Sequence, residues 1–214
     1  MKPYLIKTPR ILEKIFSNYT WHFNANKKEI FLTFDDGPTP KITAFVLDQL
    51  KRYNAKATFF CIGKNIQRNS GLFHQIIEEK HAIGNHTHHH LNGWKSDTVT
   101  YIDDILKCEH TISETLDISL KSRLFRPPYG RITKSQSKEI LKRNYTIIMW
   151  DVLSADFDTS ISKEKCLENV LKNTKNGSIL VFHDSEKASE KVQFVLPKVL
   201  EYFSKKEFTF KAIQ

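Results

Sequence analysis

Short apolar runs alternate along this chain with stretches of helical periodicity, and this alternation restricts the fold more than any other feature. Seven runs, rich in β-branched or aromatic residues, have the length of buried strands: 30–34, 57–62, 82–84, 124–126, 146–150, 178–182 and 208–213. Apolar stripes at three- and four-residue spacing predict helices around 42–50, 73–77, 102–112 and 195–203. Strands that alternate with helices pair in parallel through right-handed crossovers, so the sequence predicts an α/β fold.

Seven strand signals favour an incomplete (β/α) barrel over a closed eightfold one. The chain has 214 residues, enough for a single domain with a large core. No repeat, linker or low-complexity tract divides it. We expect a lead segment at residues 1–28 and one folded domain at residues 29–214.

Polar residues follow the predicted strands, and in barrels of this kind the active-site residues lie at the C-terminal ends of the strands. The first group is Thr33-Phe34-Asp35-Asp36-Gly37-Pro38. Because side chains alternate along a strand, adjacent carboxylates point in different directions, so one can bind a cation while the other acts as a base. The pattern does not say which does which, and Asp-Asp-Gly-Pro is also good turn chemistry.

A histidine-rich group, residues 84–90, follows the third strand signal. His86 and His90 are four residues apart, so one helical turn would place both imidazoles on the same side, able to share a metal. The spacing is half of a zincin motif, but Thr87 stands where that motif has its glutamate base. A base must then come from Asp35 or Asp36.

Three further groups follow later strands: 126–130 with the sequence Arg-Pro-Pro-Tyr-Gly, 150–157 with Asp156 and Phe157, and 180–184 with His183. Each is also compatible with a plain turn. Together the five groups supply every role in metal-assisted hydrolysis, namely ligands, a base, an oxyanion donor and an acid.

These five groups, in this order, resemble the motifs of the NodB-homology polysaccharide deacetylases (carbohydrate esterase family four). The resemblance covers the chain from about residue 30 to residue 184. It implies a distorted, incomplete (β/α)7 barrel. It also implies a metal held by Asp36, His86 and His90, with Asp35 as catalytic base and His183 as catalytic acid.

The resemblance also implies supporting roles. Arg126 would orient the base, Asp156 would support the protonated acid, the backbone N–H of Tyr129 would hold the oxyanion, and Leu180 would line the acetyl pocket. The sequence departs from the family pattern at Phe157, where the family usually has tryptophan; phenylalanine keeps the apolar wall but lacks the indole N–H.

The implied activity is metal-dependent removal of N-acetyl groups from N-acetylglucosamine-containing polysaccharide or oligosaccharide, chitin-like or peptidoglycan-like, with release of acetate. Two alternatives stay open: an amidohydrolase of the same fold acting on a small non-sugar amide, and an inactive carbohydrate-binding or metal-binding relative. Two histidines and an aspartate favour Zn²⁺, although Co²⁺, Ni²⁺, Mn²⁺ and Fe²⁺ also suit this set.

Composition restricts the partners. The net charge is +9, but the lysines are scattered and no basic stripe carries interleaved aromatics, so we expect no nucleic-acid binding.

Cys61, Cys108 and Cys166 are far apart and indicate neither a disulfide framework nor a thiolate zinc site. Charges interrupt the first 19 residues and no run approaches a membrane span, so we expect a cytoplasmic protein, with export by another route and the oligomeric state left open.

Overall fold

The computed structural model of this chain describes residues 4–24, 26–117 and 123–214. Its strands form one parallel sheet in the order β5-β4-β3-β2-β1-β7-β6, with β8 paired to β1 outside this path. The strands are β1 (Glu29–Asp35), β2 (Ala57–Cys61), β3 (Ala82–Asn85), β4 (Leu124–Phe125), β5 (Thr146–Ile147), β6 (Val152–Leu153), β7 (Ile179–His183) and β8 (Thr209–Phe210). Because β5 and β6 end this path without pairing to each other in the described residues, the barrel is incomplete, and the predicted (β/α)7 architecture is confirmed.

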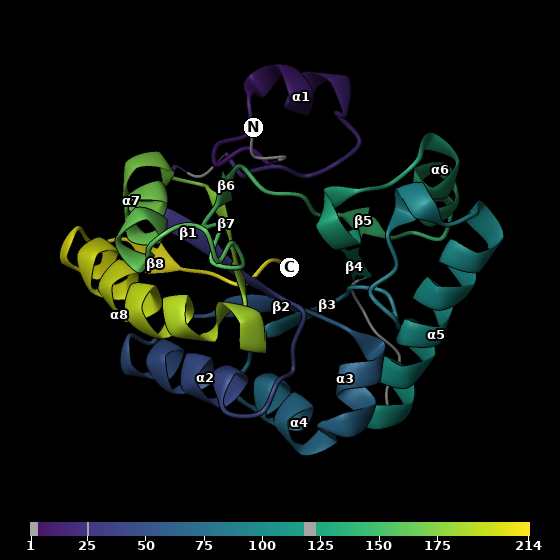
Figure 1. The fold of residues 1–214 in the computed structure, drawn as a ribbon, viewed down its shortest axis with the longest axis horizontal. Helices are drawn as coiled ribbons and strands as arrows, with labels where there is room; N and C mark the ends of the chain where they lie inside the picture. Colours follow the sequence, from purple (N-terminus) through teal and green to yellow (C-terminus); the bar gives the residue numbers. More distant parts are fainter. Residues whose placement is uncertain (1–3, 25, 118–122) are drawn as a thin grey trace.

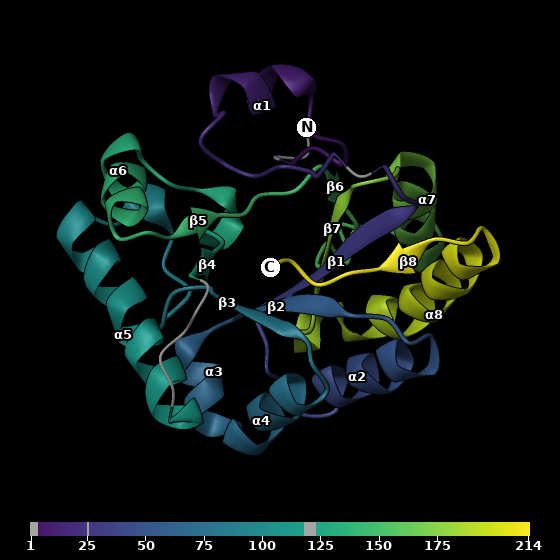
Figure 2. The same cartoon turned by 180° about the vertical axis from the view of Figure 1, so that it is seen from behind.

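Helices cover the outside of the curved sheet (Figures 1 and 2). They are α2 (Ile42–Arg52), α3 (Gly63–Arg68), α4 (Ser70–Glu78), α5 (Thr98–Leu116), α6 (Lys134–Lys142), α7 (Lys163–Asn173) and α8 (Ser189–Lys205). The remaining α-helix, α1 (Arg10–Ile15), belongs to the lead segment. Alternate residues of β1 divide between two environments: Leu32 and Phe34 join the core cluster under the helices, whereas Phe31 packs against a separate interior cluster. This alternation decides which residues of each strand can reach a site inside the barrel.

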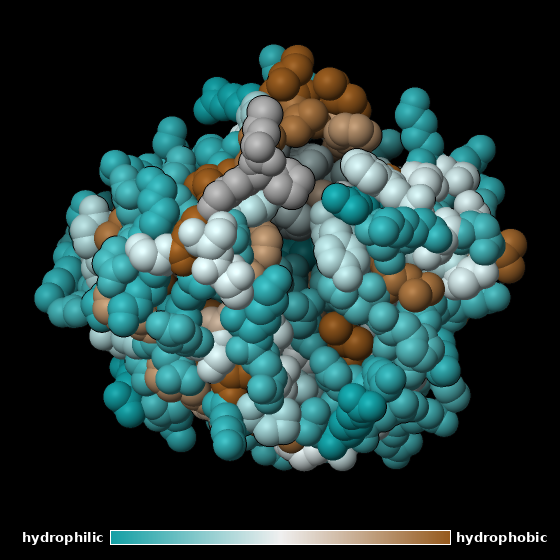
Figure 3. Space-filling model, in the orientation of Figure 1, coloured by the Kyte–Doolittle hydropathy of each residue, from teal (hydrophilic) through white to brown (hydrophobic). Residues whose placement is uncertain are grey.

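Residues 4–24 and 26–28, the described part of the lead segment, lie across the open side of the barrel. Thr20 forms a parallel bridge with Ile148, just after β5, and Lys7 forms an antiparallel bridge with Val152 in β6. The segment therefore contacts both unpaired edges of the sheet. Its helix α1 exposes apolar side chains, which appear as a brown area at the top of Figure 3.

Several elements escaped prediction from the sequence. The predicted strand at 146–150 ends at Ile147, and the two-residue strand β6 that follows is too short to give a pattern of its own. Helix α6 has few apolar residues, and it begins at a capping box in which Thr133 and Gln136 satisfy each other's backbone amides. Helices α3 and α7 were also missed.

The carboxyl ends of the parallel strands meet at one edge of the sheet. Asp35 at the end of β1 is the register partner of His183 at the end of β7. All three cysteines are buried and free. Among the described residues no helix combines the length and the apolar composition that a bilayer span requires.

Candidate metal and catalytic site

Three side chains that the sequence assigned to a metal lie together at this edge. Asp36, His86 and His90 each offer one ligand atom, and these atoms lie within 4.8 Å of one another. Oδ1 of Asp36 is 3.6 Å from Nε2 of His86 and 3.2 Å from Nε2 of His90. This is the arrangement that a single divalent ion needs.

Loops rather than a helix bring the two histidines together. Residues 86–90 follow β3 without helical hydrogen bonds, and His90 has a φ of 57°. The expected helical turn is therefore wrong, although the expected convergence of His86 and His90 is present. Asp36 also has a positive φ, 82°, which turns its side chain away from the direction that the end of β1 would give it.

Asp104, on α5, holds the loop that carries His90. Its Oδ2 accepts hydrogen bonds from the backbone amides of His88 and His89, both at 2.9 Å. Its Oδ1 lies 2.5 Å from Nδ1 of His89. His88 and His89, which received no role from the sequence, thus fix the loop rather than point at the metal cluster.

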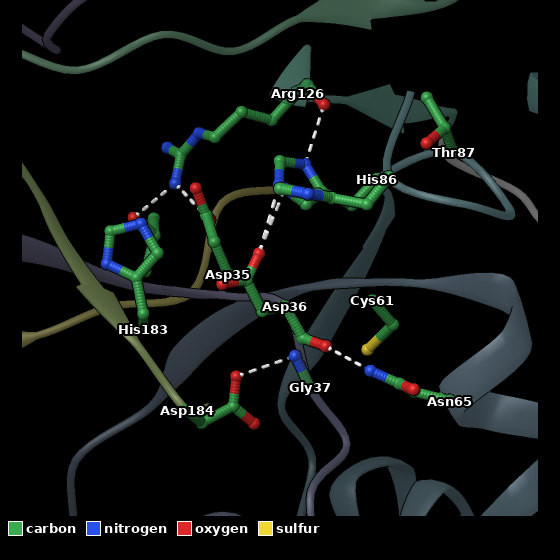
Figure 4. Close-up of polar contacts among 12 residues, drawn as sticks. Asp35, Asp36, Gly37, Cys61, Asn65, His86, Thr87, Arg126, His183 and Asp184 are labelled. Carbon is green, nitrogen blue, oxygen red and sulfur yellow. Dashed lines mark hydrogen bonds and ion pairs between the residues drawn. The ribbon is translucent and has the colours of Figure 1, made fainter. Parts of the chain in front are cut away.

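The donor set fits a divalent metal. Nδ1 of His86 lies 2.8 Å from the carbonyl oxygen of Arg126, so the proton on Nδ1 leaves Nε2 with a free lone pair (Figure 4). Burial lowers the pKa of His86 to about 4, which keeps the ring neutral as metal binding requires. Oδ1 of Asp36 is buried and accepts no hydrogen bond, and a bound cation would be the partner that this oxygen lacks.

The charge of Asp36 is also set by its neighbours. Burial alone would raise the pKa of this carboxyl, but the imidazoles of His90, His183 and His86 outweigh it and hold the pKa well below its usual range. The carboxylate is therefore ionised over the whole physiological range.

Asp35 faces a different partner. Arg126 is fully buried, and its Nη1 donates to Oδ1 of Asp35 and to the Thr33 hydroxyl, each at 2.7 Å. Its other nitrogens donate to the carbonyls of Ile148 and Met149. Figure 4 shows the guanidinium reaching across the barrel to Asp35. A buried arginine with all of these donors used holds one carboxylate oxygen in a fixed place.

His183 is paired with Asp156. Oδ1 of the buried Asp156 lies 2.7 Å from Nδ1 of His183, and its Oδ2 accepts the His183 backbone amide at 2.7 Å. Burial alone would lower the pKa of His183, but the Asp156 carboxylate, with Asp36 and Asp35, raises it to about 10. Phe157 packs edge-on against the imidazole at 5.1 Å between centroids.

The structure separates the two residues expected around the substrate. The Tyr129 side chain is 61 % exposed, and its ring lies 4.6 Å from the His90 ring. Leu180 does not fit the acetyl pocket: it is three residues before His183, so it points to the opposite face of β7 and joins the core under the helices. Val181, two residues before His183, shares the face of the acid.

One further buried group was missed. Asp184 accepts hydrogen bonds from the Gly37 amide at 3.0 Å and from the Thr43 hydroxyl at 2.5 Å, and its own amide donates to the Asp35 carbonyl. Burial raises the pKa of Asp184 to about 7. Asp184 ties the loop after β1, which carries both catalytic-site aspartates, to β7. Its place directly after His183 was the only signal in the sequence.

Comparison with known proteins places this geometry among relatives. The model of a family described as polysaccharide deacetylase matches residues 22–148. Two curated proteins of Bacillus cereus, both named peptidoglycan-N-acetylglucosamine deacetylase, are similar. One is 36 % identical over 89 % of this chain and 89 % of its own length, the other 37 % identical over 78 % of this chain. The chain covers 60 % of the length of the second protein.

A solved structure gives the same result at the level of the fold. The crystal structure of a peptidoglycan N-acetylglucosamine deacetylase, in complex with a naphthalenyl N-oxidanyl-benzamide, superposes with a TM-score of 0.87 and 31 % identity. The match covers 96 % of this chain and 95 % of that one. Nearly the whole chain therefore has a counterpart in a solved relative.

Proposed function

We propose, from the premise that this chain belongs to the polysaccharide deacetylase family, that it removes acetyl groups from N-acetylglucosamine residues of a peptidoglycan-like glycan. The observation that carries the proposal is the meeting of Asp36, His86 and His90 with Asp35 and His183 at one edge of the sheet. Relatives named for this activity over most of the chain support the choice of substrate.

Asp36, His86 and His90 would hold the metal. A divalent ion bound there would polarise the acetyl carbonyl and lower the pKa of a water molecule toward ~7. The mixture of imidazole and carboxylate ligands favours Zn²⁺, and Co²⁺, Ni²⁺, Mn²⁺ and Fe²⁺ are the other candidates.

Asp35 is the proposed base. Arg126 holds its Oδ1 at 2.7 Å and thereby fixes the carboxylate plane. Oδ2 is then the oxygen that accepts the proton of the attacking water. A positioned base of this kind contributes about 10²–10⁴ to the rate. Arg126 acts through Asp35 and is a positioning residue.

His183 is the proposed acid. Its Nδ1 is committed to Asp156, so Nε2 is the atom that donates a proton to the departing sugar amine. The raised pKa keeps the imidazole charged at neutral pH. Asp156 therefore keeps the acid both protonated and oriented.

Tyr129, Phe157 and Val181 would line the pocket for the acetyl group and the leaving amine. The backbone N–H of Tyr129 would donate to the oxyanion, and one such donor contributes about 10²–10³ to the rate. Phe157 packs against His183 and would exclude water from the leaving amine. Val181, rather than Leu180, is on the right face of β7 to line the pocket.

Residues 29–214 form the proposed catalytic domain. The lead segment, residues 1–28, would act as a strap across the open side of the barrel, because Lys7 and Thr20 bridge to the strand region beside that opening. Its removal should leave the residues around β5 and β6 exposed.

The test is acetate release from peptidoglycan fragments and N-acetylglucosamine oligomers by the metal-loaded protein, followed by mass spectrometry. We expect deacetylated glycan and one acetate for each amine formed. Chelation should stop acetate release, and Asp35→Asn should slow it by about 10²–10⁴. Hydrolysis of small non-sugar amides alone would favour the alternative amidohydrolase. Glycan binding without turnover under any of the five metals would identify an inactive relative.

A further inference from the structure

An exposed tryptophan stands beside the candidate site without an apolar partner to explain it. Trp94 is 65 % exposed and lies in a short 3-10 turn (Gly93–Lys95), four residues after His90. An isolated exposed aromatic residue of this size is costly to hydrate and is typical of binding surfaces.

The surroundings hold the Trp94 ring in one place. Its indole Nε1 donates to the carbonyl of Ile132 at 3.3 Å, and its backbone amide donates to the Asn92 side chain at 3.0 Å. Nε2 of the buried Gln136 donates to the carbonyls of Gly93 and Ser96, at 2.8 and 3.1 Å. The turn is therefore fastened to the start of α6 on both sides, and the indole is presented with little conformational entropy left to lose on binding.

A free cation accompanies the ring. The Arg131 guanidinium lies 5.1 Å from the centroid of the indole. Within the described part of the chain, no carboxylate forms an ion pair with Arg131. A guanidinium stacked on an aromatic ring keeps its edge nitrogens available for a carboxylate in the plane of the group.

The pair is adjacent to the metal cluster. Tyr129, whose ring packs at 4.6 Å against that of His90, is two residues from Arg131, a span of at most about 7 Å of extended chain. A glycan with one sugar at the metal site would therefore extend past Tyr129 toward Trp94.

We propose that Trp94 and Arg131 form a binding subsite for a sugar next to the one deacetylated, and that the subsite selects glycans that carry a carboxylate. The indole would stack on the apolar C–H face of a pyranose, and Arg131 would pair with a carboxylate substituent on that sugar or on the next. This inference rests on the proposed function and narrows the class of glycan on which the enzyme acts. It favours acidic, peptidoglycan-type glycans over neutral chitin-type ones.

The experiment compares two substrates of equal length. One is the neutral tetramer of N-acetylglucosamine, and the other is a peptidoglycan tetrasaccharide with its lactyl carboxylates. Acetate release gives kcat and KM for the parent, Trp94→Ala, Arg131→Gln and the charge-preserving Arg131→Lys. Arg10→Gln, which removes an exposed arginine from α1, is the matched control for lost charge.

We expect Arg131→Gln to raise KM about fivefold on the acidic tetrasaccharide and to leave KM unchanged on the neutral one. Arg131→Lys should restore part of the preference, and Arg10→Gln should behave as the parent does. Trp94→Ala should raise KM on both substrates by about tenfold at unchanged kcat. Metal content and melting temperature of each variant show that the site is intact.

Equal KM values for parent and Arg131→Gln on the acidic substrate would overturn the subsite while leaving the deacetylase activity standing. A parent that releases no acetate would instead contradict the proposed function. In that case, calorimetric titration would measure the affinity of both tetrasaccharides for the parent and for Arg131→Gln, and would still test whether the subsite binds the acidic one. Acidic-substrate affinity that does not depend on Arg131 would refute it.

Discussion

Replacing Asp156 by asparagine should move the pH range in which this enzyme is active. The substitution keeps the shape of the side chain but removes the charge that lies 2.7 Å from Nδ1 of His183. Burial, the largest influence on this imidazole, would then lower its pKa with less opposition. A metal ion on Asp36 would offset one of the charges that raise this pKa in the parent and in the variant alike, so the difference between the two loaded enzymes is the loss of the Asp156 charge. Without that charge the pKa should fall toward the ordinary value of about 6.5.

The magnitude follows from the two pKa values. With a pKa of about 10, His183 is almost fully protonated at about pH 7.5. At a pKa of about 6.5 or below, at most about a tenth of the molecules keep the proton at that pH. Because the protonated form is the acid, activity is lost as pH rises through the pKa. The variant should therefore lose at least about tenfold in kcat/KM near neutrality.

The assay is the pH profile of kcat/KM for acetate release, with metal content measured at every pH because the histidine ligands release the metal in acid. The alkaline limb should lie about 1–3 pH units lower in Asp156→Asn than in the metal-loaded parent. Asp151→Asn is the matched control: Asp151 is also buried, but it pairs with Lys7 and Ser178. An alkaline limb that stays in place in Asp156→Asn, or that moves equally in Asp151→Asn, would refute the reasoning.

Three further outcomes are expected. Asp35→Asn should lower kcat by about 10²–10⁴ at unchanged metal content, whereas Asp36→Asn should lose the metal by elemental analysis; the reverse pattern would exchange their roles. Gly37→Ala should destabilise the protein by about 1–3 kcal/mol in thermal denaturation, because the new Cβ would lie 1.9 Å from Oδ2 of Asp184, and adding Asp184→Ala should recover part of that loss. Titration with DNA and RNA at physiological salt should show no submicromolar binding, despite the net charge of +9.

Local pattern was enough to predict the longer elements. Strands β1, β2, β3 and β7 appear in the sequence as short apolar runs, and helices α2, α4, α5 and α8 as apolar stripes at three- and four-residue spacing. Each could therefore be located without its neighbours. Strand β6 could not be located, because two residues are too few to form a pattern, and helix α6 could not, because few of its residues are apolar. Strand β6 forms because it pairs with β7 at the edge of the sheet, and α6 begins at the capping box of Thr133 and Gln136.

The partners of the lead segment show the same limit. Nothing in residues 1–28 indicates that Thr20 and Lys7 bridge to the region of β5 and β6. These pairings depend on where an open barrel leaves unpaired strand edges, which is a property of the assembled sheet rather than of the segment.

The sequence by itself determined the fold class and the chemical groups available at the strand ends, because both follow from residue types in a local order. Only the tertiary structure decided which atoms meet. It placed Asp36 against two imidazoles and Asp35 against Arg126, and it turned Leu180 away from the site. These choices depend on loop dihedrals and on strand register, and contacts distant in the sequence fix both.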